Sequence, residues 1–351
     1  MKYISKDNFL KLLEFLQRDY YIYIPIKKGN KLFYKRLINN KDSKANISRI
    51  DDMVIGGVRI SEPLKSFFVK AREKVAEGFK SPLLEENKPY CIVGVKACDL
   101  KSLEVYDYVF CNHDYTDPFY IKKREENLII SSDCTNTLDT CFCLAVGVKP
   151  YPQKNFDINL SEINSGFIIE VGSQKGQELI NKYPFLFEET ENELIKQRDE
   201  RREKVIKKLK KNIEENNVPD YSLFKGIIER NFESDIWKDE AKTCVECGAC
   251  NTICPTCHCF LLYDQMNNNK MARLRIWDSC MIKDFAEVAG GANPRPRLWM
   301  RLRNRFEKKF DFFFKVAHLY ACTGCGRCIL ACPANIDIRK VLRRLVDASK
   351  G

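Results

Sequence analysis

Cysteine is the residue type with which this chain could do the most chemistry, because eight of its cysteines form two matching runs. The runs consist of Cys244, Cys247, Cys250 and Cys254, and of Cys322, Cys325, Cys328 and Cys332, each followed by a proline. This x2-x2-x3 spacing is typical of ferredoxins that hold two [4Fe–4S] clusters, in which the fourth cysteine of each run binds the other cluster. The pattern therefore predicts two clusters and one-electron transfer.

Zinc is the alternative metal for closely spaced thiolates. Zinc sites usually combine two Cys-x2-Cys pairs, or one such pair with histidines. Four cysteines in a repeated x2-x2-x3 pattern closed by proline do not correspond to a simple tetrahedral site. A chain with structural zinc would be a non-catalytic scaffold, and analysis for iron and acid-labile sulfide would distinguish it from an iron–sulfur protein.

A second group of cysteines lies in the first half of the chain. Cys134, Cys141 and Cys143 are close in sequence, and Cys98 follows a predicted strand at the start of a predicted helix. Because α/β folds place ligands at the carboxyl ends of strands, these four residues are candidates for a third metal site. A [4Fe–4S] cluster is favoured over zinc there, and the alternative is four buried free thiols, which behave as small hydrophobic residues.

Further sulfur and imidazole groups follow the first run. We expect Cys257, His258, Cys259 and the later Cys280 to shield or tune the neighbouring cluster, and direct ligation by the three cysteines is the alternative. The chain has only three histidines, so few residues could serve as the base in a mechanism that needs a histidine. It has no glycine-rich nucleotide motif, so it is not expected to bind NAD itself.

The composition indicates a globular protein in a reducing compartment. Of 351 residues, 44% are hydrophobic and 17 are cysteines, an odd number that favours metal binding in the cytosol over disulfides. The first residues carry charges where a secretory signal would need an apolar stretch. No segment approaches the ~20 apolar residues of a membrane span. We therefore expect a cytoplasmic protein.

The formal net charge of +11 is concentrated in two basic stretches, Lys204–Lys211 and residues 295–309. We interpret them as solvated faces that also offset the negative charge of the clusters, and a docking surface for an acidic redox partner is the alternative. Neither stretch is interleaved with a nucleic-acid motif, so no nucleic-acid partner is expected.

The chain is predicted to be an α+β protein in three parts: a mixed α/β domain (1–190), a charged connecting helix (191–219) and an α-helical ferredoxin-like domain with two [4Fe–4S] clusters (220–351). In the first part, hydrophobic patterns predict helices over 7–18, 99–110 and after Gln174, and strands over 20–26, 91–95, 128–130, 143–148 and 167–172. The long insert between the cysteine runs is predicted to add helices at 261–263, 281–285 and the Arg-rich segment.

Several segments resemble one family, from about residue 57 onward. They are Gly94–Leu100, Asp117-Pro118-x-Tyr120, Cys141-Phe142-Cys143, Cys247–Cys250, Cys254–Phe260, Trp277–Cys280 and Gly324–Cys328. Together they resemble the iron–sulfur subunit of anaerobic sulfite reductase and the closely similar beta subunit of sulfhydrogenases. The ferredoxin runs are generic, whereas the Cys-Phe-Cys and Trp-Asp-Ser-Cys segments make the resemblance specific.

The resemblance implies an electron relay within a complex. A flavin subunit would oxidise NAD(P)H, this chain would pass the electrons on through clusters held by the eight cysteines of the runs, and a terminal subunit would do the chemistry. In the sulfite reductase that terminal subunit carries sirohaem and reduces sulfite to sulfide, and in the sulfhydrogenase it is a nickel–iron hydrogenase. Sulfite reduction is the favoured hypothesis and the sulfhydrogenase type the alternative, and no catalytic residue is expected in this chain.

Overall fold

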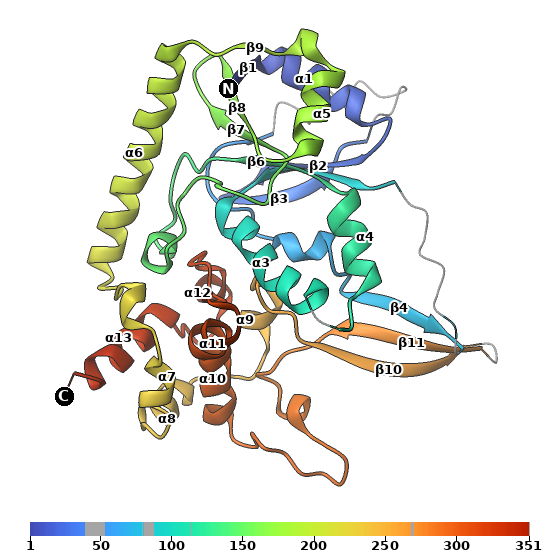
Figure 1. The fold of residues 1–351 in the computed structure, drawn as a ribbon. Helices are drawn as coiled ribbons and strands as arrows, with labels where there is room; N and C mark the ends of the chain where they lie inside the picture. Colours follow the sequence, from blue (N-terminus) through green and yellow to red (C-terminus); the bar gives the residue numbers. More distant parts are fainter. Residues whose placement is uncertain (39–52, 79, 81–87, 113, 268–269, 351) are drawn as a thin grey trace.

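The computed structural model describes most of the chain: residues 1–38, 53–78, 80, 88–112, 114–267 and 270–350. A large mixed sheet with helices on both faces occupies one side of the molecule, and the helices of the last third of the chain gather on the other side (Figure 1). A smaller three-stranded sheet projects from the junction between these two regions.

Among the described residues, the large sheet has eight strands in the order β3-β2-β5-β6-β7-β8-β1-β9. The strands are β1 (Lys2–Ser5), β2 (Tyr21–Lys28), β3 (Lys31–Arg36), β5 (Tyr90–Val95), β6 (Leu128–Ser132), β7 (Ile158–Glu162), β8 (Gly166–Val171) and β9 (Glu188–Glu189). The four neighbours β2, β5, β6 and β7 are parallel, and the outer strands pair antiparallel. The carboxyl ends of β5 and β6 therefore lie side by side, which is where α/β folds place ligands.

Two layers of helices cover this sheet. Helices α1 (Lys6–Leu16) and α5 (Gln174–Lys182) lie on one face, and α3 (Ala97–Cys111) and α4 (Pro118–Glu126) lie on the other (Figure 1). On β5, Cys91 and Val93 face the first layer, whereas Ile92 and Val95 face the second. Val93 and Val95 point to opposite layers because the register with β6 shifts at Gly94, a β-bulge with φ of 77°.

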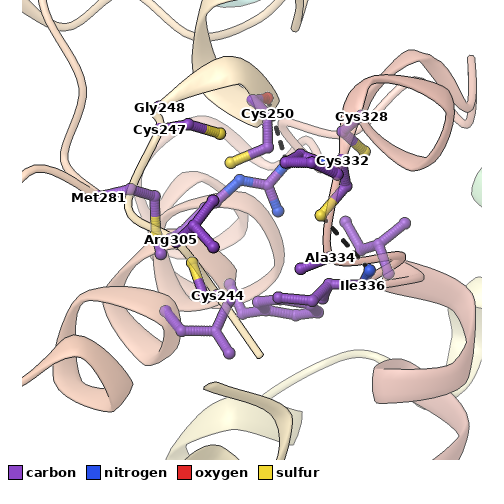
Figure 2. A pocket seen from close by; sticks show the side chains of 15 residues that line it. Cys244, Cys247, Gly248, Cys250, Met281, Arg305, Cys328, Cys332, Ala334 and Ile336 are labelled. Atoms are coloured by element: carbon purple, nitrogen blue, oxygen red, sulfur yellow. Dashed lines mark hydrogen bonds between the residues drawn. The ribbon is translucent and has the colours of Figure 1, made fainter. Parts of the chain in front are cut away.

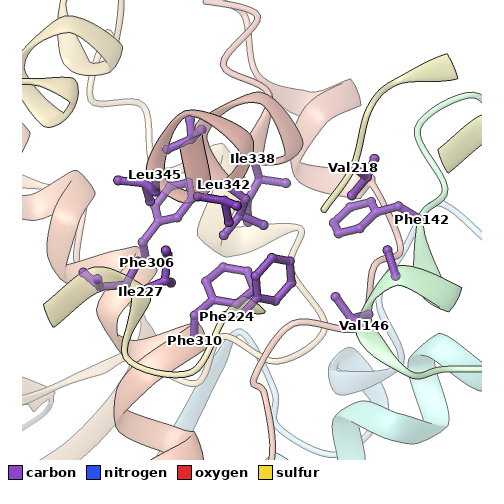
Figure 3. Packing of buried hydrophobic residues seen from close by; sticks show 14 of the residues in the cluster. Phe142, Val146, Val218, Phe224, Ile227, Phe306, Phe310, Ile338, Leu342 and Leu345 are labelled. Atoms are coloured by element: carbon purple, nitrogen blue, oxygen red, sulfur yellow. The ribbon is translucent and has the colours of Figure 1, made fainter. Parts of the chain in front are cut away.

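The helices that follow the long α6 (Asn192–Glu215) are shorter, and they build a separate core. They are α7 (Ile227–Arg230), α8 (Ile236–Ala241), α9 (Ala249–Thr252), α10 (Leu298–Glu307), α11 (Phe313–Ala317), α12 (Arg327–Ala331) and α13 (Ile338–Ala348). Phe306, Phe310 and Leu342 lie at the centre of this core, and Phe142 from the first half of the chain packs into the same cluster (Figure 3). The loop that carries Cys141 and Cys143 is thus anchored in the core of the helical region.

Most predicted elements are confirmed, but two are wrong. Residues 143–148 do not form a strand: Cys143–Val146 is a 3₁₀ helix that ends at Gly147, whose φ of 74° is left-handed. The segment 261–263 is not helical but belongs to β10 (Phe260–Asn267), which pairs with β11 (Lys270–Trp277). A short apolar run does not distinguish the two structures, and pairing of β11 with the distant β4 (Arg72–Glu77) decides for a strand.

The small sheet joins the two halves of the chain, because β4 comes from the first half and the hairpin from the insert between the cysteine runs. Arg275 on β11 bonds to Glu73 on β4 at 2.6 Å and also to Asp117, and both members of the Arg275–Glu73 pair are buried. Among the described residues, no helix is both long enough and apolar enough to cross a bilayer.

Candidate metal centres

Cysteines from both runs surround one cavity (Figure 2). Cys328 and Cys332 line it together with Cys244, Cys247 and Cys250. We call Cys244, Cys247, Cys250 and Cys332 the first set. Apolar side chains complete the wall, among them Val245, Met281, Leu302, Phe306, Ile336 and Ile338. The amide of Ile336 donates a hydrogen bond to Cys332 Sγ at 3.4 Å. Such a donor favours negative charge on the sulfur, as a metal-bound thiolate requires.

The other four cysteines of the runs form the second set: Cys254, Cys322, Cys325 and Cys328. Burial raises the pKa of Cys322 to about 12, and the nearby thiols of Cys328 and Cys254 add to the increase. Cys254 thus lies among cysteines of the other run, as Cys332 does in the first set. The exchange of the fourth cysteine between runs is the arrangement that the ferredoxin spacing predicts.

The two loops have the same backbone shape. Glu246 and Gly248 in the first loop, and Gly324 and Gly326 in the second, all have left-handed φ between 54° and 68°. Alternation of ordinary and left-handed residues curls the chain so that successive amides face inward, which suits an anionic group. Position 324 must be glycine because a Cβ there would come within 2.5 Å of the Cys143 backbone.

Three cations lie buried at intervals of four residues in the Arg-rich segment, which was expected to offset the charge of the clusters from a solvated face. Arg301, Arg305 and Lys309 are 1%, 5% and 4% exposed, so this side of the Arg-rich segment is not a solvated face. The Lys309 ammonium donates to Cys254 Sγ at 3.2 Å, to Thr256 Oγ1 at 3.0 Å and to the Ala321 carbonyl at 3.1 Å. The i, i+4, i+8 spacing of the three cations was the available signal, since it places them along one side of a helix.

Lys309 lies on a π-helical turn, Lys308–Phe312, between α10 and α11. Such turns interrupt an α-helix and are frequent at functional sites. Arg305, one turn earlier, donates to Asn251 Oδ1 at 3.1 Å and to the Cys250 carbonyl at 3.4 Å. A cation therefore contacts each C-terminal set, which offsets the negative charge that thiolates and clusters bring into a buried site.

Cys98, Cys134, Cys141 and Cys143 form the N-terminal set. They line a cavity separate from that of the first set. Cys98 opens α3 just after β5, and Cys134 follows β6, so both lie at adjacent carboxyl strand ends. The structure thus brings together the four cysteines that the sequence proposed as one site.

Buried cations also surround the N-terminal set. Lys96 donates to Ser132 Oγ at 2.8 Å and to three carbonyls between 2.9 and 3.0 Å, which ties the ends of β5 and β6 together. Arg59 lines the cavity, and its Nη2 is a buried donor without a hydrogen-bond acceptor among the described residues. A buried donor is expected to have a partner. An anionic group in this cavity would therefore fit the residues present.

The N-terminal set lies directly against the second set. The Phe142 amide donates to the Gly324 carbonyl at 2.8 Å, and Cys325 lines the same cavity as Cys98. Arg327 and Asp99, each 1% exposed at the side chain, form an ion pair of 2.7 Å across this junction. The three sets consequently follow one another in space, with the second set in the middle.

A hydrogen bond with Cys257 lowers the pKa of Cys254, whereas burial has the opposite effect on other thiols of the sets. Burial raises the pKa of Cys250 and Cys134 to about 11. Binding of iron must therefore release protons from these thiols. In the described part of the chain, no three His, Cys, Asp or Glu side chains are grouped closely enough for a single metal ion. The thiols of the first set and those of the N-terminal set instead line two cavities, each of which could hold a cluster.

The remaining candidates occupy other positions. Cys257, Cys259 and Cys280 line another cavity, which Lys309 and Arg305 also line. His258 packs edge-on against Tyr106, Phe110 and Phe313, and burial lowers its pKa to about 4, so the ring is neutral.

Comparisons with known proteins agree with this arrangement. Residues 243–336 match the 4Fe-4S dicluster domain, which implies two [4Fe–4S] clusters. The chain is 31% identical over 299 residues to sulfhydrogenase 2 subunit beta of Pyrococcus furiosus, an alignment that covers 84% of this chain and 86% of that protein. It is 22% identical over 182 residues to the beta subunit of an F420-dependent formate dehydrogenase of Methanocaldococcus jannaschii, covering 50% of this chain and 38% of that protein. No solved structure matches.

The likeness to the Pyrococcus protein spans both the large sheet and the helical region, so it is not confined to the generic ferredoxin runs. The dicluster domain alone covers only the part of the chain that holds the first and second sets. Taken with the thiol geometry, these likenesses show that the chain belongs to the sulfhydrogenase beta-subunit family and is an iron–sulfur protein of electron transfer.

Proposed function

We propose that this chain is the electron relay of a sulfhydrogenase-type complex, with a [4Fe–4S] cluster in the first, the second and the N-terminal set. The observation that carries the proposal is the succession of three thiol sets in contact, each next to a buried cation. Bound clusters of this kind supply one-electron reduction and oxidation. The residues of the chain hold them in order and exclude water from them.

We assign the ligands from the spacing of the two runs together with the cavity linings, and Cys328 also lines the cavity of the first set. Cys244, Cys247, Cys250 and Cys332 would hold one cluster, and Cys254, Cys322, Cys325 and Cys328 would hold the next. Cys98, Cys134, Cys141 and Cys143 would hold the third, against Cys325. The sequential order places the N-terminal set at one end of the relay and the first set, with the exposed Cys247, at the other end.

The partners are inferred from the family. The relative is a sulfhydrogenase beta subunit, which supports a complex in which flavin and hydrogenase subunits exchange electrons through this chain. A sulfite reductase complex with a sirohaem subunit rests on the motif resemblance alone. Purification of the complex under anaerobic conditions separates the two: nickel and hydrogen-dependent dye reduction support the first, and a sirohaem absorbance supports the second.

Electron paramagnetic resonance of the reduced, full-length protein tests the relay itself. Three interacting spins per chain, together with about twelve iron atoms, are expected if all three sets are filled. Two spins would remove the N-terminal set from the relay. Protein that is colourless and contains zinc without acid-labile sulfide would overturn the proposal.

A further inference from the structure

The cavity lined by Cys257, Cys259 and Cys280 contains a pair of thiols that the relay does not use. Cys259 immediately precedes β10, and Cys280 comes three residues after the end of β11. Phe260 and Trp277 are opposite each other in the hairpin, and the Asp278 amide donates to the Cys259 carbonyl at 2.9 Å. This pairing holds the two chain segments together, and the side chains of Cys259 and Cys280 line the same cavity.

The surroundings of the pair are not those of two thiols that merely fill an apolar core. Asn251 Nδ2 donates to Cys280 Sγ at 3.0 Å. Arg305 and Lys309 line the same cavity, and in the described part of the chain no carboxylate forms an ion pair with either cation. Cations and amide donors next to a thiol favour its thiolate, which is the reactive form. The hydrogen bond from Cys259 and the bond from Asn251 accordingly lower the pKa of Cys280.

Intermediate residues connect the pair to both the first and the second set. Asn251, which bonds to Cys280, is the neighbour of Cys250 in the first set. Lys309 lines the cavity and bonds directly to Cys254 of the second set. The pair thus lies between two proposed one-electron sites.

We propose that Cys259 and Cys280 form a redox-active pair that alternates between dithiol and disulfide and exchanges two electrons with the relay. The proposal rests on the proposed cluster sites as the electron acceptors. On oxidation, the sulfur-bound protons are lost and one S–S bond forms. The two electrons reduce two [4Fe–4S] clusters by one electron each, and the protons leave through the cavity, which reaches the surface at Phe312, 39% exposed. Reduction of the disulfide reverses each of these changes.

The test uses the full-length protein with its clusters, poised anaerobically at a series of potentials with mediator dyes. The samples are quenched in acid, free thiols are alkylated, and peptides are examined by mass spectrometry. A Cys259–Cys280 linkage is expected at the oxidising end and free thiols at the reducing end. Cys280→Ser is expected to take up about two electrons fewer per chain in a reductive titration. Cys257→Ser, the matched control from the same cavity, is expected to keep the linkage.

Two outcomes would overturn the proposal. One is that both thiols remain free at every potential in protein whose iron and sulfide content is complete. The other is that Cys259→Ser and Cys280→Ser contain less iron than the parent, because the residues would then be cluster ligands. Iron and sulfide are measured on the same samples, so an absence of clusters counts against the proposed relay and is separate from the linkage result.

Discussion

The first and second sets lie in the helical region, and the N-terminal set lies in the α/β region. All three use cysteine side chains, but different kinds of backbone structure carry them. In the helical region, six of the eight thiols lie on two short loops whose left-handed residues curl them into the same shape. In the α/β region, the four thiols come from the ends of two parallel strands and from a 3₁₀ turn, and β5, β6 and α3 must all be in place before they meet. The first kind of site is carried by local sequence, and the second exists only as a product of the fold.

Among the cysteines of the helical region, Cys325 is the residue whose replacement is expected to have the largest effect, and the change is Cys325→Ser. We expect the loss of one cluster, about four iron atoms per chain, and an end to electron transfer through the complex, because a relay fails when its middle member is missing. Iron analysis and NAD(P)H- or hydrogen-driven turnover would measure this. Cys111→Ser, a change at a partly exposed thiol outside all sets, should retain both iron and turnover.

The corresponding change on the N-terminal side is Cys141→Ser. We expect iron to fall by about four atoms per chain while the spectroscopic signals of the first and second sets persist. Cys143→Ser should have the same effect, since it belongs to the same set. Iron content equal to that of the parent in both variants would mean that the N-terminal thiols are structural.

The junction between the two regions depends on the buried Arg327–Asp99 pair. Asp99→Asn leaves a buried guanidinium without its counter-charge, so we expect a loss of about 3–5 kcal/mol in the free energy of unfolding. Asp235→Asn, which removes an exposed ion pair with Lys238, should cost roughly 0–1 kcal/mol. Denaturant unfolding of the three proteins under anaerobic conditions would measure the difference, and equal losses would show that the junction does not depend on this pair.

The smallest expected effect concerns the potential of the second set. Lys309→Met removes a positive charge and a hydrogen bond from Cys254, so the reduced cluster, which carries more negative charge, becomes harder to form. A bond to a charged group contributes about 1.5–3 kcal/mol, which corresponds to a decrease of roughly 60–130 mV for one electron. Spectroscopic redox titration would detect it. Lys309→Arg keeps the charge and should shift the potential less; an unchanged potential in Lys309→Met would contradict the role.

Much of the candidate site could be read from the sequence because cluster loops are local. The spacing of Cys244 to Cys254 and of Cys322 to Cys332 was sufficient to predict a ferredoxin-type pair, and the matching domain agrees with it. The strands at 91–95 and 128–130 were also recognisable, since buried parallel strands are continuous apolar runs. The rule that ligands lie at the carboxyl ends of strands was the basis for grouping Cys98 with Cys134.

Other features could not be read in this way. The segment 261–263, which belongs to β10, was expected to be helical. The hairpin β10–β11 pairs with β4, which lies far away in the sequence, and such pairing is not visible in a local pattern. The Arg-rich segment was expected to offset the charge of the clusters from a solvated face, although Arg301, Arg305 and Lys309 are buried. Their partners are carbonyls and thiols of other segments, so only the assembled structure identifies them.

The amino-acid sequence by itself determined the kind of chemistry, because the number and spacing of thiols on one short loop limit which cofactors they can bind. Only the tertiary structure decided which thiols share a cavity, that the N-terminal set lies against the second set, and which cations are buried beside them. The physical reason is the sequence distance over which each feature is determined. A few backbone angles set the ligand spacing within a loop, whereas contacts between loops depend on the packing of the sheet and helices that carry them.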